Sequence, residues 1–281
     1  MFERFARSWT LVKASASVLK QDKELMLFPV ISVIASLLVV ASFVLPLFGL
    51  LDLKALEQGE REPVWLYAWV FLFYLAQYFV IFYFNTALVG AAMIRLRGGD
   101  PTVADGLQIA WSKVGTILGY ALIAATVGLI LRAIEERAGM IGKWIAGLLG
   151  AAWTVLSFLT VPVLVSRDIG PLEAVKESAL LLKKTWGENV IGQGGVGLVF
   201  GLLQFFVITL TVVALIAVVA SKSVFLIVSV IALGGLTILA LALVQAALSG
   251  IYSAALYRHA MGEDTVGIDS GMLASAFAVK R

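Results

Sequence analysis

Long apolar runs separated by short polar segments dominate the chain. A helix needs about 20 apolar residues to cross the ~30 Å hydrocarbon core of a bilayer. Six runs approach or exceed this length: residues 25–51, 64–94, 114–131, 143–165, 191–220 and 223–257. The last two runs are so close together that they must form a tight helical hairpin. The pattern predicts an all-α integral membrane protein whose six transmembrane helices form three hairpins.

Three of the polar segments also have a helical period. In residues 2–20, 100–114 and 170–190, apolar residues recur every three or four positions opposite charged residues. The stripe in the third segment consists of Leu172, Val175, Ala179, Leu182 and Trp186. We expect each segment to be an amphipathic helix at the membrane interface, preceding an outward-going span. They could equally pack on the ends of the bundle as structural elbows, and the two readings are compatible.

The first residues of the middle segment indicate where its helix begins. Asp100 is a favoured N-cap residue, and Pro101 suits the first helical position. We therefore expect this helix to begin at Asp100-Pro101. Proline also predicts a kink within the fourth apolar run, at Pro162, because it cannot donate a backbone hydrogen bond.

The distribution of positive charge predicts the orientation. With the N-terminus in the cytoplasm, most of the 21 Lys and Arg residues fall on the cytoplasmic side. The short charged stretch at residues 132–137 is then a loop on the outer side. Both termini are expected to be cytoplasmic, and the tail at residues 259–281 lies there too.

An internal similarity suggests how the chain is organised. The sequences VKASASVLK (12–20) and VKESALLLK (175–183) are identical at six of nine positions. This predicts a single membrane domain, residues 1–281, built from repeat units 1–94, 95–165 and 166–258. Each unit would consist of an interfacial helix and a transmembrane hairpin. Chance similarity between two amphipathic helices is the alternative explanation.

The composition supports this fold class and argues against several functions. Only 14% of the residues are charged, against roughly 25% in ordinary soluble domains. The chain has no cysteine, which excludes disulfides and thiolate metal ligands. Its net charge of +3, without a long basic run, gives no indication of a nucleic-acid partner.

Catalytic chemistry is not indicated either. No Asp, Glu, Lys or Arg lies deep in any apolar run, although ion-driven transporters usually need ionisable residues there. The sole histidine, His259, follows the last run, where a solvated or interfacial role is the simpler interpretation. Nucleophile–base pairs, metal-ligand spacings and phosphate-binding loops are absent as well. We therefore expect a non-enzymatic protein without a catalytic, metal or cofactor site.

Two sets of residues are candidates for binding. Basic residues on the predicted cytoplasmic helices could contact anionic lipid headgroups. They are Lys13, Lys20, Lys113, Arg167, Lys176, Lys183 and Lys184. Amides within the spans could line a cavity for an amphipathic ligand, or they could simply hold helices together. These are Gln77, Asn85, Gln204 and Gln245.

Residues 5–32 (FARSWTLVKASASVLKQDKELMLFPVIS), 95–107 (RLRGGDPTVADGL) and 161–188 (VPVLVSRDIGPLEAVKESALLLKKTWGE) carry a resemblance. They resemble a prokaryotic family of polytopic membrane proteins that is known only as a domain of unknown function. In layout alone, the chain is also similar to the non-catalytic membrane portion of some glycerophosphodiester phosphodiesterases. The resemblance implies a multi-pass protein of the prokaryotic inner membrane and implies no activity.

Two functions remain open on these observations. In the first, the protein binds or organises membrane lipids, anionic ones on the cytoplasmic side, or acts as a scaffold for another membrane protein or a second copy of itself. In the second, it is a facilitator or flippase for lipids, isoprenoids or other amphipathic molecules, with the four amides lining its cavity.

Overall fold

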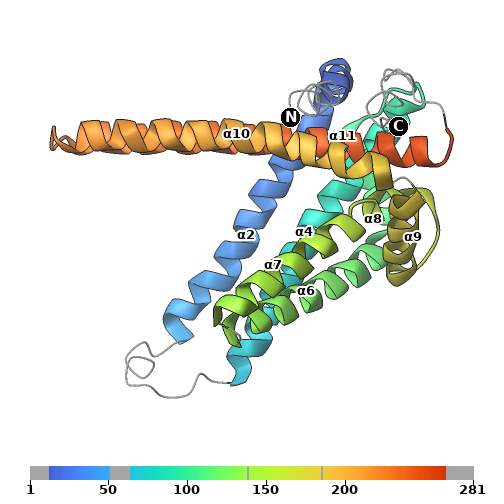
Figure 1. The fold of residues 1–281 in the computed structure, drawn as a ribbon, viewed down its shortest axis with the longest axis horizontal. Helices are drawn as coiled ribbons and strands as arrows, with labels where there is room; N and C mark the ends of the chain where they lie inside the picture. Colours follow the sequence, from blue (N-terminus) through green and yellow to red (C-terminus); the bar gives the residue numbers. More distant parts are fainter. Residues whose placement is uncertain (1–12, 51–63, 138, 185, 264–281) are drawn as a thin grey trace. The chain divides into compact units, whose positions relative to one another are not determined.

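The computed structural model describes residues 13–50, 64–137, 139–184 and 186–263 of the chain (Figure 1). These residues form helices and the turns between them, with no strand in the described ranges. Six of the helical stretches are long and apolar enough to cross a membrane, which confirms the predicted number. The protein is therefore a multi-pass α-helical membrane protein.

The long helices are named by their order along the chain. They are α2 (Leu27–Leu50), α4 (Val64–Leu96), α6 (Val114–Arg137), α7 (Gly139–Leu156), α10 (Trp186–Val219) and α11 (Val224–Ala260). Four shorter helical segments connect them: a 3-10 turn η1 (Lys23–Met26), α5 (Val103–Ser112), α8 (Thr160–Ser166) and α9 (Pro171–Lys184). Residues 13–21 are helical as well and are called the N-terminal helix below.

The chain divides into two compact units. The first unit comprises Met1–Met26, Ala92–Pro101 and Lys184–Arg281, and the second comprises Leu27–Ala91 and Thr102–Lys183. The hairpin of α10 and α11 dominates the first unit, and α2, α4, α6, α7, α8 and α9 belong wholly or mainly to the second.

In the first unit, α10 and α11 run side by side as a hairpin (Figure 1). The turn between them is short, and Lys222 within it has a positive φ of 53°. Close packing requires glycine at position 234, because a Cβ there would lie 2.6 Å from the Thr211 side chain. Near the other end of the hairpin, a buried cluster contacts Ala16 and Leu19 of the N-terminal helix. The cluster consists of Val196, Val199, Phe200 and Leu248.

In the second unit, α6 and α7 pack side by side along their length (Figure 1). Helix α4 meets α6 where the rings of Phe82 and Tyr120 stack with centroids 4.3 Å apart. Helix α2 meets α4 where the Trp69 indole donates a hydrogen bond of 3.1 Å to the Phe43 carbonyl. Aromatic side chains of α4 therefore provide much of the described contact between these helices.

One helix boundary differs from the sequence-based prediction. Residues 132–137 are not a loop but the last turns of α6, where Arg132 and Glu136 form an i,i+4 ion pair at 2.7 Å. Residues 171–184 of the predicted segment 170–190 form α9, and residue 185 lies outside the described residues.

The predicted start of α5 was also wrong. Its N-cap is Thr102, whose hydroxyl accepts from the Asp105 N–H while the Asp105 carboxylate accepts from the Thr102 N–H. This reciprocal capping box satisfies two orphan donors, which a lone Asp100 cap would not do. The Thr102 N–H bond also holds the pKa of Asp105 below its ordinary value. Asp100 instead pairs with the Arg95 guanidinium.

The fourth apolar run is a broken helix. Residues 157–159 form a turn between α7 and α8, upstream of Pro162. Proline cannot donate to the carbonyl four residues earlier, which here belongs to Phe158, and its ring crowds that carbonyl. The predicted effect of Pro162 is thus confirmed, and it is a full interruption of the helix. Backbone groups released in such a break need other partners, since unpaired polar groups are costly in an apolar environment.

Candidate functional site

Ser178 of α9 supplies these partners at the break. Its hydroxyl accepts a hydrogen bond from the Leu159 N–H at 3.0 Å and donates one to the Leu156 carbonyl at 2.7 Å. The side chain is fully buried, as are the neighbouring Leu159 and Thr160. A single serine therefore clamps α9 to the interrupted fourth span.

This clamp determines which face of α9 is buried. The buried residues are Ala174, Ser178, Leu181 and Leu182. Leu172, which opens the predicted apolar stripe, is instead 70% exposed. The predicted stripe therefore coincides only in part with the face that packs on the protein, since Leu182 is buried and Leu172 is not, and a wheel that counts serine as polar does not recognise Ser178 as a buried anchor.

The opposite face of α9 has a mixed character. Leu172 and Leu180 are exposed there, and Lys176 and Lys183 are exposed beside them. On a helix with 3.6 residues per turn these four positions fall within one arc of about 80°. Leucines and lysines on one exposed face are typical of a helix at a membrane surface, where apolar side chains enter the headgroup region and ammonium groups reach phosphates.

Two of the other predicted headgroup contacts have protein partners. The Lys113 ammonium lies 3.1 Å from an Asp168 carboxylate oxygen and donates to the Arg167 carbonyl at 3.2 Å. Arg167 pairs with Glu177 of α9 at 3.0 Å. These contacts fasten the end of α5 and the start of α9 to the segment after α8. Lys184 closes α9, and its side chain lies outside the described part of the structure.

The N-terminal helix repeats the burial pattern of α9. Ser15 and Val18 are buried, as are Ser178 and Leu181 at the equivalent positions of the similar nine-residue sequence. Lys13 and Lys20 are exposed, as are Lys176 and Lys183. Residues 2–12 of the predicted stripe lie outside the described residues. Both copies thus present two lysines seven residues apart, on the exposed side.

A further polar cluster at the end of the N-terminal helix was missed in the sequence. Asp22 is 5% exposed and lies 3.4 Å from the Arg95 guanidinium, at the end of α4. Burial raises the pKa of the Asp22 carboxyl above its ordinary value, and the charge of Arg95 offsets part of this effect. The two residues are 73 positions apart, so sequence spacing carries no signal of the pair.

The four intramembrane amides are divided between the two units. Gln204 of α10 donates to Gln245 of α11 at 3.2 Å within the first unit. Gln77 and Asn85 lie on α4 in the second unit, where both are half-buried. Among the described residues, the Gln77 Oε1 is buried without a hydrogen-bond partner. The Gln204–Gln245 hydrogen bond joins α10 to α11.

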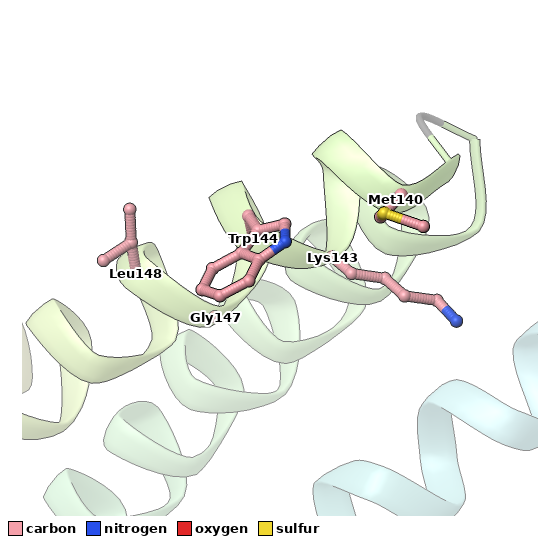
Figure 2. A pocket seen from close by; sticks show the side chains of 5 residues that line it. All are labelled: Met140, Lys143, Trp144, Gly147 and Leu148. Atoms are coloured by element: carbon pink, nitrogen blue, oxygen red, sulfur yellow. The ribbon is translucent and has the colours of Figure 1, made fainter.

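A shallow hollow of about 410 Å³ lies on the outer side of α7, close to its first residue. Met140, Trp144 and Leu148 border it, and Gly147 leaves it open (Figure 2). Lys143 lies at its rim, with its amino group extended toward the start of the helix (Figure 2). None of these residues was selected from the sequence.

No group of three or more His, Cys, Asp or Glu side chains able to hold a metal ion occurs among the described residues. The site features are thus exposed basic and apolar faces on a multi-pass membrane protein. Residues 64–267 match a family described as a family of unknown function (DUF6159). Because this match covers more than half of the chain, the protein belongs to that family. No curated protein matches the chain.

Proposed function

We propose that this protein binds anionic phospholipids at the cytoplasmic surface of a prokaryotic inner membrane, through α9 and the N-terminal helix, and that it has no catalytic activity. The exposed face of α9 carries the proposal. Leu172 and Leu180 stand there beside Lys176 and Lys183, on the side away from the Ser178 clamp. Each lysine near an anionic leaflet contributes on the order of 1 kcal/mol to membrane attachment.

The proposed layout is three hairpins, each preceded by an interfacial helix, with both termini in the cytoplasm. The order of the helices supports it: the N-terminal helix precedes α2, α5 precedes α6, and α9 precedes α10. The similar burial of the N-terminal helix and α9 favours a common origin of the predicted sequence repeats 1–94 and 166–258 over chance similarity.

Lipid retention after purification tests the proposal. Native mass spectrometry would compare phosphatidylglycerol and phosphatidylcholine adducts of the wild type with those of Lys176→Gln, Lys183→Gln and the double variant. We expect about a fivefold loss of phosphatidylglycerol retention per lysine, in line with the contribution of one lysine near an anionic surface. Glu173→Gln, an exposed change of opposite sign on the same helix, should increase retention. Unchanged retention in the double variant would refute the role of α9.

One pair of observations favours the alternative of a facilitator or flippase. The Gln77 Oε1 is buried and unpaired within α4, and the fourth span is interrupted at residues 157–159. Interrupted membrane helices and unpaired polar atoms are both found beside substrate pathways. Proteoliposomes that scramble fluorescent lipid above the rate of empty vesicles, with the rate reduced by Gln77→Leu, would support this function. Equal rates with and without protein would exclude lipid scrambling.

A further inference from the structure

The hollow on α7 combines an apolar groove with one cation at its rim. Met140 and Trp144 are 79% and 72% exposed, so this face of α7 is covered by little protein. A Cβ added at Gly147 would meet nothing within 4 Å, so the space above Gly147 is open, and this glycine lines the hollow together with Trp144 and Leu148. Its volume of about 410 Å³ lies within the ~300–1,000 Å³ range of small-molecule sites.

The position of Lys143 gives the hollow a polarity. The fourth candidate span begins at Gly139, so Lys143 lies within the first two helical turns of that span. Side chains on a helix tilt toward its N-terminus, and the Lys143 amino group extends in that direction in Figure 2. A lysine so placed holds its ammonium at the level of the headgroups while its methylene chain remains in the apolar region. Trp144 beside it has the amphipathic ring that is favoured at the same depth.

We propose that this hollow is a binding site for a single anionic phospholipid. One acyl chain lies across Gly147 between Trp144 and Leu148, and the phosphate pairs with Lys143. Because α9 follows the opposite end of the same span, this site is separate from the face of α9 that carries the proposed function. Charge complementarity selects the occupant, since a zwitterionic lipid would fill the groove equally well but gain less from the lysine.

Three substitutions separate the two parts of this site. Lys143→Gln removes the charge and keeps the groove. Gly147→Leu fills the hollow and keeps the charge, and its Cβ enters open space with nothing within 4 Å. Lys222→Gln is the matched control, because it removes one exposed lysine from the turn between α10 and α11. All three are made in the Lys176→Gln/Lys183→Gln background, so that lipid bound to α9 does not contribute.

The measurement is native mass spectrometry of protein exchanged into phosphatidylglycerol or phosphatidylcholine with the same acyl chains. We expect Lys143→Gln to lower phosphatidylglycerol retention about fivefold, to the level of phosphatidylcholine. Gly147→Leu should reduce retention of both lipids, and Lys222→Gln should change neither. Melting temperatures in detergent confirm that each variant is folded.

Two results would overturn the site. One is a Lys143→Gln variant that retains phosphatidylglycerol as well as Lys222→Gln does. The other is a Gly147→Leu variant with undiminished retention of both lipids. Because the α9 lysines are already absent, either result would leave the proposed function of α9 untouched. Loss of retention from the α9 substitutions alone would conversely leave the hollow unaffected.

Discussion

The N-terminal helix and α9 share six residues of a nine-residue segment and bury the same serine position, but they are fastened to their units in different ways. The N-terminal helix packs Ala16 and Leu19 on an apolar cluster of α10 and α11. Helix α9 is clamped by Ser178 to the backbone of an interrupted span. The same short sequence can thus be anchored by packing or by hydrogen bonds, depending on what its neighbour offers.

Among substitutions that test this difference, truncation of the apolar cluster beneath the N-terminal helix should lower the stability most. Phe200→Ala removes a buried ring from the cluster beneath the N-terminal helix. Aromatic truncations in protein cores cost about 3–5 kcal/mol, and we expect about 3 kcal/mol at this site. Hydrogen exchange should increase in residues 13–21 and stay unchanged in residues 171–183. Phe205→Ala is the control, because Phe205 is exposed on the same helix and its loss should be nearly neutral.

Removal of the Ser178 hydroxyl should loosen α9 and leave the N-terminal helix unchanged. Ser178→Ala leaves the buried Leu159 N–H and the Leu156 carbonyl without their partner. One such orphan group costs about 1–3 kcal/mol, so we expect a loss of about 2 kcal/mol, measured by thermal unfolding in detergent. Exchange should now increase in residues 171–183. If Ser15→Ala destabilises the protein as much as Ser178→Ala, the two helices are not anchored differently.

The buried carboxyl of Asp22, which follows the N-terminal helix, should make the stability of the protein depend on pH. Burial penalises the charged form of Asp22 in the folded protein, and this raises the pKa of its carboxyl above the ordinary value of 3.8. The stability contributed by Asp22 is therefore full below about pH 4 and is lost as the pH rises through the raised pKa. Asp22→Asn stays neutral, so its melting temperature should improve relative to the wild type from pH 4 to pH 7. A constant difference across this range would contradict the role of burial.

Loss of the Arg167–Glu177 ion pair of α9 should lower the stability least. Arg167 and Glu177 are 37% and 27% exposed, so solvent screens their attraction. Glu177→Gln should cost about 0.5 kcal/mol or less, as is typical of partly exposed pairs. Urea or thermal unfolding at low and high salt measures this, and the small difference from wild type should disappear at high salt. An effect as large as that of Ser178→Ala would show that charge, and not the serine, fastens α9.

The sequence predicts the fold class well because membrane crossing is a matter of length and composition. Six apolar runs correspond to six helical stretches, and Pro162 marks the interrupted one. The family resemblance was likewise confirmed for residues 64–267, although the similar segment 5–32 lies outside this match. Local rules were sufficient for these features, since each depends on residues close together in the chain.

The binding surfaces were harder to predict because they depend on tertiary partners. Lys176 is exposed and Lys113 pairs with Asp168, but both are simply lysines of amphipathic helices in the sequence. Ser178 looked like an ordinary polar residue of an amphipathic helix, although it is buried. The hollow on α7 was missed as well. The predicted fourth apolar run begins at residue 143, whereas α7 begins at Gly139 and so places Lys143 and Met140 on the same helix. The predicted N-cap of α5 was wrong because two residues close together, Asp100 and Thr102, are both suitable caps, and the helix uses Thr102.

The short turn between α10 and α11 has a consequence for biosynthesis. With only residues 220–223 between them, we expect the two helices to enter the bilayer together as a pair. Gln204 and Gln245 satisfy one another across the pair, so neither amide passes through hydrocarbon with its hydrogen-bonding groups wholly unpaired. Insertion then carries one charge, that of Lys222, to the far side. A longer hydrophilic linker at this turn should therefore slow membrane integration without changing any contact of the finished protein.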